Sequence, residues 1–468
     1  QLARIRPLAS SQATPAPPPP TDSIEAFLVD AVASLLSDGT PDPVRPLADL
    51  GMDSLAVLEL RELITTKLRV ELPSDQRIGG QSIRELAAAL ATRPHVAPSG
   101  PPTSMGDDAR LDPSIRFTPR ERTPPREILL TGATGFLGAF LLAELLARTR
   151  ATIHCLVRGD DGMRRLGSVL GRYGLPALEL ADRVRVHAGD LGKPRLGLAS
   201  PAVVETIDTI IHNGASVNFV YPYEALKADN VDGTHEILRL AARTRATLHY
   251  VSTIGVFPAG RREPVLEADR SASPDLLALG YMRAKWVAEE LVSQARARGL
   301  DVSIYRPGTI SNHSLTGAFN PDDFVCAMIK GCVQLGVAPR VDVSVNLAPV
   351  DYVSRALVGI AFGHRAGTYH LIGREAVAWN ELVDWVRRLG YPLAELPYAA
   401  WRALLPERAV PTRNALAPLL PLFAAHEDIA WLQLPTYDDA NARAASGLPG
   451  PGLDAAYVRR SVERFEPI

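Results

Sequence analysis

The sequence has only three cysteines among its 468 residues, Cys155, Cys326 and Cys332. An odd number of cysteines without metal-type spacing argues against a disulfide framework and against a zinc site. We therefore expect no bound metal. We also expect a cytoplasmic location, because free thiols persist in a reducing compartment.

The sequence also lacks a strong net charge and long apolar runs. Its formal net charge of −2 gives no electrostatic basis for binding nucleic acid or an anionic membrane surface. No apolar run approaches the roughly 20 residues that a membrane-spanning helix needs, and the N-terminus has no signal-peptide pattern. The chain begins at Gln1 rather than at a methionine, so we expect a piece of a longer protein. For the oligomeric state, which the sequence leaves open, we take a monomer as the default.

Proline is concentrated in two stretches, residues 13–21 and 93–127. Such composition favours extended chain without a packed core, so we predict linkers at 1–21 and 93–125. The block between them, residues 22–92, has apolar residues at helical spacing and helix-start signals. We expect a small all-α, four-helix bundle there.

The long block that follows, residues 126–468, alternates short buried strands with helical patterns. The alternation predicts an α/β Rossmann-type, doubly wound parallel sheet over 126–310. After residue 311 the pattern is less regular, so we expect 311–468 to form a smaller, mostly helical substrate-binding part. From this part, 345–362 is expected to return to the sheet. We further expect a strand, turn and helix at 127–147 and strands within 151–159, 183–191, 209–215, 247–257 and 301–310. A helix is expected at 378–391, and loops and short helices that cover a pocket are expected at 392–421.

A glycine-rich turn, "TGATGFLG", places Gly132, Gly135 and Gly138 between an apolar strand and an apolar helix. Glycines at this spacing permit a tight turn, close approach to a pyrophosphate and close packing of helix on strand. The amide groups at the helix N-terminus favour phosphate binding. The turn therefore predicts a dinucleotide site.

The second strand ends at Arg158, twenty residues after the last glycine of the turn. An acidic side chain here binds a ribose 2′-hydroxyl, whereas a guanidinium suits a 2′-phosphate. We favour NADPH, with Arg165 as a second phosphate contact or a solvated helix residue. Asp160 is the feature that argues for NAD instead.

Lysine occurs only five times in the chain, and Lys285 follows Tyr281 by four positions in "YMRAK". On a helix, the two side chains lie on one face. A nearby ammonium lowers the pKa of a phenol, so we expect Tyr281 to exchange a proton with substrate near neutral pH. Ser252 or Thr253, at the end of a strand, can donate to a reacting oxygen, and spacing favours Thr253.

These segments resemble the extended short-chain dehydrogenase/reductase superfamily over residues 128 to about 360. More narrowly, "CLVRG", "HNGASVNFVYPYEALKADNVDGT", Trp286, "RPGTISNHSLTGAFNPDDF" and "VDYV" resemble thioester reductases of polyketide and nonribosomal peptide assembly lines. Ala284 departs from the serine often found there. The resemblance implies further cofactor contacts at Thr134, Phe136, Leu137, Asp190, Leu191, Asn213, Gly214, Ala215, Asn230, Pro307 and Gly308, with Lys285 on the nicotinamide ribose.

Ser54, in "LGMDSLAVLEL", precedes an apolar-periodic helix. As a simple helix cap it would contribute about 1 kcal/mol. The stretch also resembles the attachment site of carrier proteins, more the polyketide than the peptidyl type. The resemblance implies 4′-phosphopantetheine on Ser54, attached by a phosphopantetheinyl transferase, with residues 22–92 as the carrier domain.

Together the two resemblances imply reductive chain release. An acyl or peptidyl thioester delivered by upstream synthase modules would be reduced with NADPH to an aldehyde, or further to a primary alcohol. Two alternatives stay open. One is a superfamily member acting on nucleotide sugars, and the other is a domain that releases or cyclises the chain without net reduction.

Overall fold

The computed structural model describes residues 21–36, 41–52, 54–64, 72, 78–91, 105–118, 123–159, 161–176, 180–261, 263–271, 273–363, 366–409 and 414–464. The chain divides into two compact units, Gln1–Pro101 and Pro102–Ile468. Each unit has its own apolar core. The described part of the chain includes no helix of the length and apolarity that crossing a membrane requires.

The described residues of the first unit contain three helices, α1 (Thr21–Leu36), α2 (Ser54–Leu63) and α3 (Ile83–Ala91). A capping box starts α3: the Glu85 amide donates to the Ser82 hydroxyl oxygen, and the Ser82 amide donates to the Glu85 carboxylate. Leucine, isoleucine and valine side chains from all three helices bury one another, as the helical spacing predicts.

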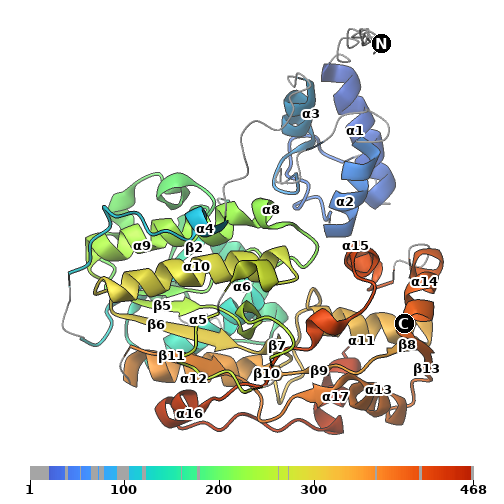
Figure 1. Cartoon of the computed structure of the whole chain (residues 1–468). Helices are drawn as coiled ribbons and strands as arrows, with labels where there is room; N and C mark the ends of the chain where they lie inside the picture. Colours follow the sequence, from blue (N-terminus) through green and yellow to red (C-terminus); the bar gives the residue numbers. More distant parts are fainter. Residues whose placement is uncertain are drawn as a thin grey trace, which may run out of the picture. The chain divides into compact units, whose positions relative to one another are not determined.

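The second unit is built on a seven-stranded sheet in the order β11-β6-β5-β4-β1-β2-β3. Its strands β5, β6 and β11 are labelled next to one another in Figure 1. Every pairing in the sheet is parallel, as the alternation of strands and helices predicts. The direction of strand order reverses between β1 and β4, where ligands bind in open α/β sheets. The strands are β1 (Glu127–Thr131), β2 (Thr152–Val157), β3 (Val184–Ala188), β4 (Thr209–His212), β5 (Thr247–Val251), β6 (Val302–Pro307) and β11 (Thr368–Leu371).

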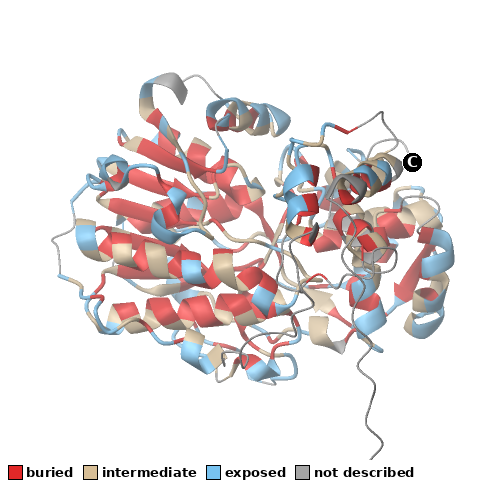
Figure 2. Ribbon diagram, turned by 90° about the horizontal axis from the view of Figure 1, so that it is seen from above, coloured by how far each residue is buried: buried red, intermediate tan, exposed pale blue. Residues whose placement is uncertain are grey.

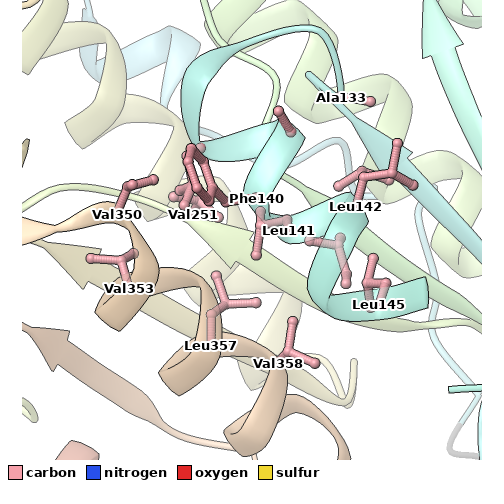
Figure 3. Packing of buried hydrophobic residues seen from close by; sticks show 14 of the residues in the cluster. Ala133, Phe140, Leu141, Leu142, Leu145, Val251, Val350, Val353, Leu357 and Val358 are labelled. Atoms are coloured by element: carbon pink, nitrogen blue, oxygen red, sulfur yellow. The ribbon is translucent and has the colours of Figure 1, made fainter. Parts of the chain in front are cut away.

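Helices cover both faces of the sheet, so its strands are almost entirely buried (Figure 2). On one face, α5 packs against α12 through leucine and valine side chains, with Phe140 beside them (Figure 3). That face carries α5 (Phe136–Arg148), α6 (Gly162–Arg172), α12 (Val350–Gly363) and α16 (Ala440–Ser446). The other carries α8 (Tyr223–Lys227), a π-helical turn (Ala228–Asp232), α9 (Gly233–Thr244) and α10 (Gly280–Ala297).

The remaining residues of this unit form a smaller, mostly helical part with a separate core. Its helices are α11 (Phe324–Leu335), α13 (Trp379–Arg388), α14 (Tyr398–Ala409), α15 (Leu420–Ala425) and α17 (Ala455–Val462). Three two-stranded sheets accompany them: β7 (Thr309–Ser311) with β10 (Leu347–Pro349), β8 (Val337–Arg340) with β13 (Ala394–Pro397), and β9 (Ser344–Val345) with β12 (Val377–Ala378). Two short helices, α4 (Met105–Asp108) and α7 (Leu180–Arg183), belong to the larger part of the unit.

The predicted linker at 93–125 is too long at its C-terminal end. Residues 105–118 pack on the second unit, where Ala109, Leu111 and Ile115 are buried in the core beneath α9 and α10. The Leu111 amide donates to the Gln294 side-chain oxygen at 3.0 Å, and Arg298 donates to the Leu111 carbonyl at 2.8 Å. Buried apolar side chains and hydrogen bonds to α10 and to Arg298 together hold this segment on the second unit.

The return of the chain to the sheet also extends beyond the predicted 345–362. The seventh strand, β11, lies after that segment and pairs with β6. The sequence analysis assigned no strand to 368–371, so the seventh strand is shown by the structure alone.

Candidate active site

A cavity of about 610 Å³ opens at the carboxyl ends of the central strands of the second unit. It brings together the glycine-rich turn, the end of β2, the loop after β5 and the start of α10. Seventeen of the predicted catalytic and cofactor residues line it: Gly132, Thr134, Gly135, Phe136, Leu137, Arg158, Arg165, Asp190, Leu191, Asn213, Gly214, Ala215, Thr253, Tyr281, Lys285, Pro307 and Gly308. Gly138 and Asn230 do not.

At its glycines, the glycine-rich turn brings the backbone close to neighbouring chain and to the cavity. Gly132 has φ +72°, and a Cβ there would lie 2.7 Å from the Gly214 Cα. A Cβ on Gly138 would overlap the carbonyl oxygen of Gly132, so Gly138 serves close packing of α5 on β1. Helix α5 follows with Gly135 as an N-cap that has no side-chain cap bond, which leaves its first amides available to a phosphate. This cradle fits a dinucleotide pyrophosphate.

A buried hydrogen-bond chain fixes the loop opposite the turn. The Thr131 hydroxyl oxygen accepts from the Gly214 amide at 2.8 Å and lies 2.8 Å from His212 Nδ1. Burial, together with the positive Lys285, lowers the pKa of His212 to about 3, so His212 is neutral here. Asn230 bonds both the amide and the carbonyl of Ser216. Asn230 therefore shapes the loop rather than lining the cavity.

Two guanidinium groups stand at the end of β2. Arg165 Nη1 donates to the Arg158 carbonyl at 2.6 Å, which ties α6 to the strand end, and both side chains line the cavity. Neighbouring Arg164 pairs instead with Asp161. Asp160, the residue that argues for NAD, lies outside the described residues.

The structure separates the two hydroxyls after β5. Ser252 is buried, and its hydroxyl donates to Glu289 at 2.5 Å. The Thr253 oxygen accepts from the Gly255 amide at 3.1 Å, so its proton is left to donate into the cavity. This supports Thr253, rather than Ser252, as the hydroxyl that meets a reacting oxygen.

Behind Ser252, Glu289 and Arg306 form a buried ion pair with Nη2 to Oε1 at 2.6 Å. Burial alone would raise the pKa of Glu289, but Arg306, Ser252 and Lys285 together lower it. Arg306 also donates to the Asp269 carbonyl at 2.9 Å and lies over the Phe257 ring. The charged pair is thus fully bonded and braces the loop that carries Thr253.

Tyr281 and Lys285 both lie on the first turns of α10 and line the cavity, as their spacing predicts. The expected lowering of the tyrosine pKa is absent: burial raises the pKa of Tyr281 to about 12. Burial also lowers the pKa of Lys285 to about 7, against the opposing effect of Glu289. Its ammonium nitrogen donates to the Val251 carbonyl at 2.6 Å and lies 4.4 Å from the Tyr250 ring centroid.

Several cavity residues escaped the sequence reasoning. Edge-to-face ring pairs run from Tyr281 to Phe219, from Phe219 to Phe324 and from Phe324 to Trp431, at centroid distances of 5.7–6.0 Å. They form one aromatic wall leading away from the predicted catalytic residues. Asp323, at the N-cap of α11, also lines the cavity, and burial raises its pKa to about 6. Phe219, Asp323 and Phe324 lie in stretches quoted for the family resemblance, whereas the stretch containing Trp431 gave no signal.

The predicted pocket cover at 392–421 is wrong for this cavity. None of its described residues lines the cavity, and the helix α14 within it packs into the core of the smaller part. The C-terminal residues that do line the cavity are Trp431, Leu432 and Leu434.

In the first unit, Ser54 is the first residue of α2. The turn before it contains Gly51 at φ +91° and the buried Met52. The helix is ten residues long, and the attachment of a prosthetic group at its first residue stays a prediction. Asp53 lies outside the described residues.

Comparison with known proteins identifies both domains. The family model for the phosphopantetheine attachment site matches residues 26–90, and the NAD-binding model described as male sterility protein matches residues 130–357. Among solved structures, the terminal R domain from the myxalamid PKS-NRPS biosynthetic pathway is 44% identical, with a TM-score of 0.72 over 77% of this chain and 96% of that chain. The chain belongs to the terminal reductase (R) domain family. Its R domain follows a phosphopantetheine carrier domain.

Other relatives of this carrier–R-domain chain are parts of much larger proteins. It is 39% identical to a linear gramicidin synthase of Brevibacillus parabrevis over 68% of this chain and 7% of that protein. It is 36% identical to the glycine betaine reductase ATRR of Emericella nidulans over 83% of this chain and 34% of that protein. The chain therefore spans about a third or less of these two curated relatives.

Proposed function

We propose that this chain reduces a thioester carried on Ser54 to an aldehyde, using NADPH. One observation carries the proposal: a single cavity joins the glycine-rich turn and Arg158 to Thr253, Tyr281 and Lys285. A chain that also contains a phosphopantetheine carrier domain has the means to hold an acyl or peptidyl group as a thioester.

The charges at the end of β2 support NADPH over NADH. Arg158 and Arg165 are joined by one hydrogen bond and line the same end of the cavity. Two guanidiniums suit a 2′-phosphate, whose charge they neutralise in a forked geometry. When bound, NADPH supplies the hydride.

The chain's own residues would act on the carbonyl oxygen and the dinucleotide. Thr253 and Tyr281 donate hydrogen bonds to the oxygen as negative charge develops on it. Tyr281 is suited to donating, because its raised pKa keeps it protonated at neutral pH. Lys285 would hold the ribose through its side-chain nitrogen.

The proposed reduction is balanced in atoms and charge. The thioester carbon gains a hydride and loses the sulfur, while one proton is taken up. The products are an aldehyde, the free carrier thiol and NADP⁺. We further propose that the thioester arrives from upstream synthase modules, since the named relatives are much longer than this chain.

A loading experiment tests the proposal. The chain is incubated with a phosphopantetheinyl transferase and an acyl-CoA, and intact mass is measured before and after NADPH is added. We expect an acyl-phosphopantetheine mass on the wild type, none on Ser54→Ala, and loss of the acyl mass with NADPH oxidation. Loss of the acyl group without NADPH oxidation would favour release without reduction. Conversion of a nucleotide sugar without net NADPH oxidation would favour the alternative in which the chain acts on nucleotide sugars.

A further inference from the structure

A segment from the C-terminal part of the chain lies against the loop that carries Thr253. The Val265 amide donates to the Thr436 carbonyl and the Asp438 amide donates to the Val265 carbonyl, each at 2.9 Å. Between these bonds, the Tyr437 ring meets Phe257 edge-on at 6.2 Å. The segment thus forms a short parallel bridge beside the predicted catalytic loop.

One peptide group connects Tyr437 to Thr253. The Tyr437 hydroxyl donates to the Ile254 carbonyl at 2.9 Å. That carbonyl and the Gly255 amide belong to the same peptide group, and the Gly255 amide donates to the Thr253 hydroxyl oxygen at 3.1 Å. Burial raises the pKa of Tyr437, which keeps its hydroxyl protonated as a donor.

We propose that Tyr437 is a positioning residue that orients the Thr253 hydroxyl through this peptide group. The idea rests on the proposed function, in which Thr253 donates to the thioester oxygen. A hydrogen bond to a peptide carbonyl fixes the peptide plane and strengthens its amide as a donor. The amide then fixes the Thr253 oxygen, and the hydroxyl proton points into the cavity.

The segment stays in place without the Tyr437 hydroxyl, so removing that hydroxyl is a clean probe. The Glu267 carboxylate accepts from the Asn441 amide at 2.6 Å, the Ala442 amide at 3.0 Å and the His370 amide at 2.9 Å. His370 Nδ1 lies 2.6 Å from the Asp438 carbonyl oxygen. These bonds do not involve the phenol.

The test compares Tyr437→Phe with Tyr398→Phe. Tyr398 is a matched control, because its hydroxyl also donates to a backbone carbonyl, that of His426, at 3.5 Å, on a helix that does not line the cavity. For the loaded thioester, we expect Tyr437→Phe to lower kcat roughly tenfold while the Kd for NADPH is unchanged. In a Thr253→Ala background the same change should add no further loss.

Amide hydrogen exchange provides a readout that does not depend on turnover. Exchange at Gly255 should be faster in Tyr437→Phe and unchanged in Tyr398→Phe. Unchanged Gly255 exchange, or an equal loss of kcat with and without Thr253, would overturn the positioning role. A wild-type chain that oxidises no NADPH with the loaded thioester would instead overturn the proposed function, whatever the exchange result.

Discussion

Ser252 donates a 2.5 Å hydrogen bond to the buried Glu289, while its neighbour Thr253 faces the cavity. Both residues line the cavity, but the Ser252 proton is donated to Glu289, whereas the Thr253 oxygen accepts from the Gly255 amide and its proton is left to donate into the cavity. Two adjacent residues of similar chemistry therefore have separate tasks, and their substitution should have separate consequences.

We expect Thr253→Ala to lower kcat by about 10²–10³, the usual effect of losing one donor to a developing oxyanion. Ser252→Ala should lower kcat far less and lower the free energy of unfolding by about 1–3 kcal/mol, because Glu289 loses a buried partner. Single-turnover NADPH oxidation and urea unfolding separate the two effects. Equal loss of kcat in both variants would contradict the assignment.

The second prediction concerns the Arg158 guanidinium at the end of β2. Arg158→Ala should raise the KM for NADPH by about 10–100-fold, since a charged hydrogen bond contributes about 1.5–3 kcal/mol, and leave the KM for NADH nearly unchanged. Arg164→Ala is the control, because Arg164 is exposed, pairs with Asp161 and is absent from the cavity lining. An equal rise for both dinucleotides would show that Arg158 does not read the 2′-phosphate.

The lowered pKa of Lys285 predicts that kcat/KM for NADPH depends on pH. Lys285, with a pKa lowered to about 7, is charged below pH 7 and neutral above it, whereas Tyr281 at about 12 stays protonated throughout. We therefore expect kcat/KM for NADPH, which reports groups of the free enzyme, to fall as pH rises from 6 to 8. Lys285→Met should lower kcat/KM and remove this inflection. A wild-type profile that is flat between pH 6 and 8 would contradict the prediction.

Glycine packing gives a prediction about stability. Gly138→Ala should prevent the close approach of α5 to β1, because the added Cβ overlaps the Gly132 carbonyl. Gly167→Ala is the matched helical control: nothing lies within 4 Å of its added Cβ, so we expect stabilisation by about 0.5–1 kcal/mol. Urea unfolding measures both, and a stable Gly138→Ala variant that binds NADPH would contradict the packing role.

Local pattern predicted the parts of the fold and site that depend on short stretches of chain. The predicted helix at 378–391 is α13, and the glycine-rich turn, Thr253, Tyr281 and Lys285 line one cavity because each follows from a strand end or a helical spacing. The features that the sequence pattern did not predict depend on contacts between residues that are far apart in the chain. Trp431 reaches the cavity through tertiary packing, and the high pKa of Tyr281 comes from burial, which spacing alone does not reveal.

Residues 105–118 have a practical consequence for exchanging domains between synthetases. A junction placed at residues 119–125 would remove Ala109, Leu111 and Ile115 and leave the apolar surface beneath α9 and α10 exposed to water. It would also leave Gln294 and Arg298 without their backbone partners. Recombination before Met105 keeps this covering with the reductase, so chimaeras joined there should remain better folded than those joined after Phe117.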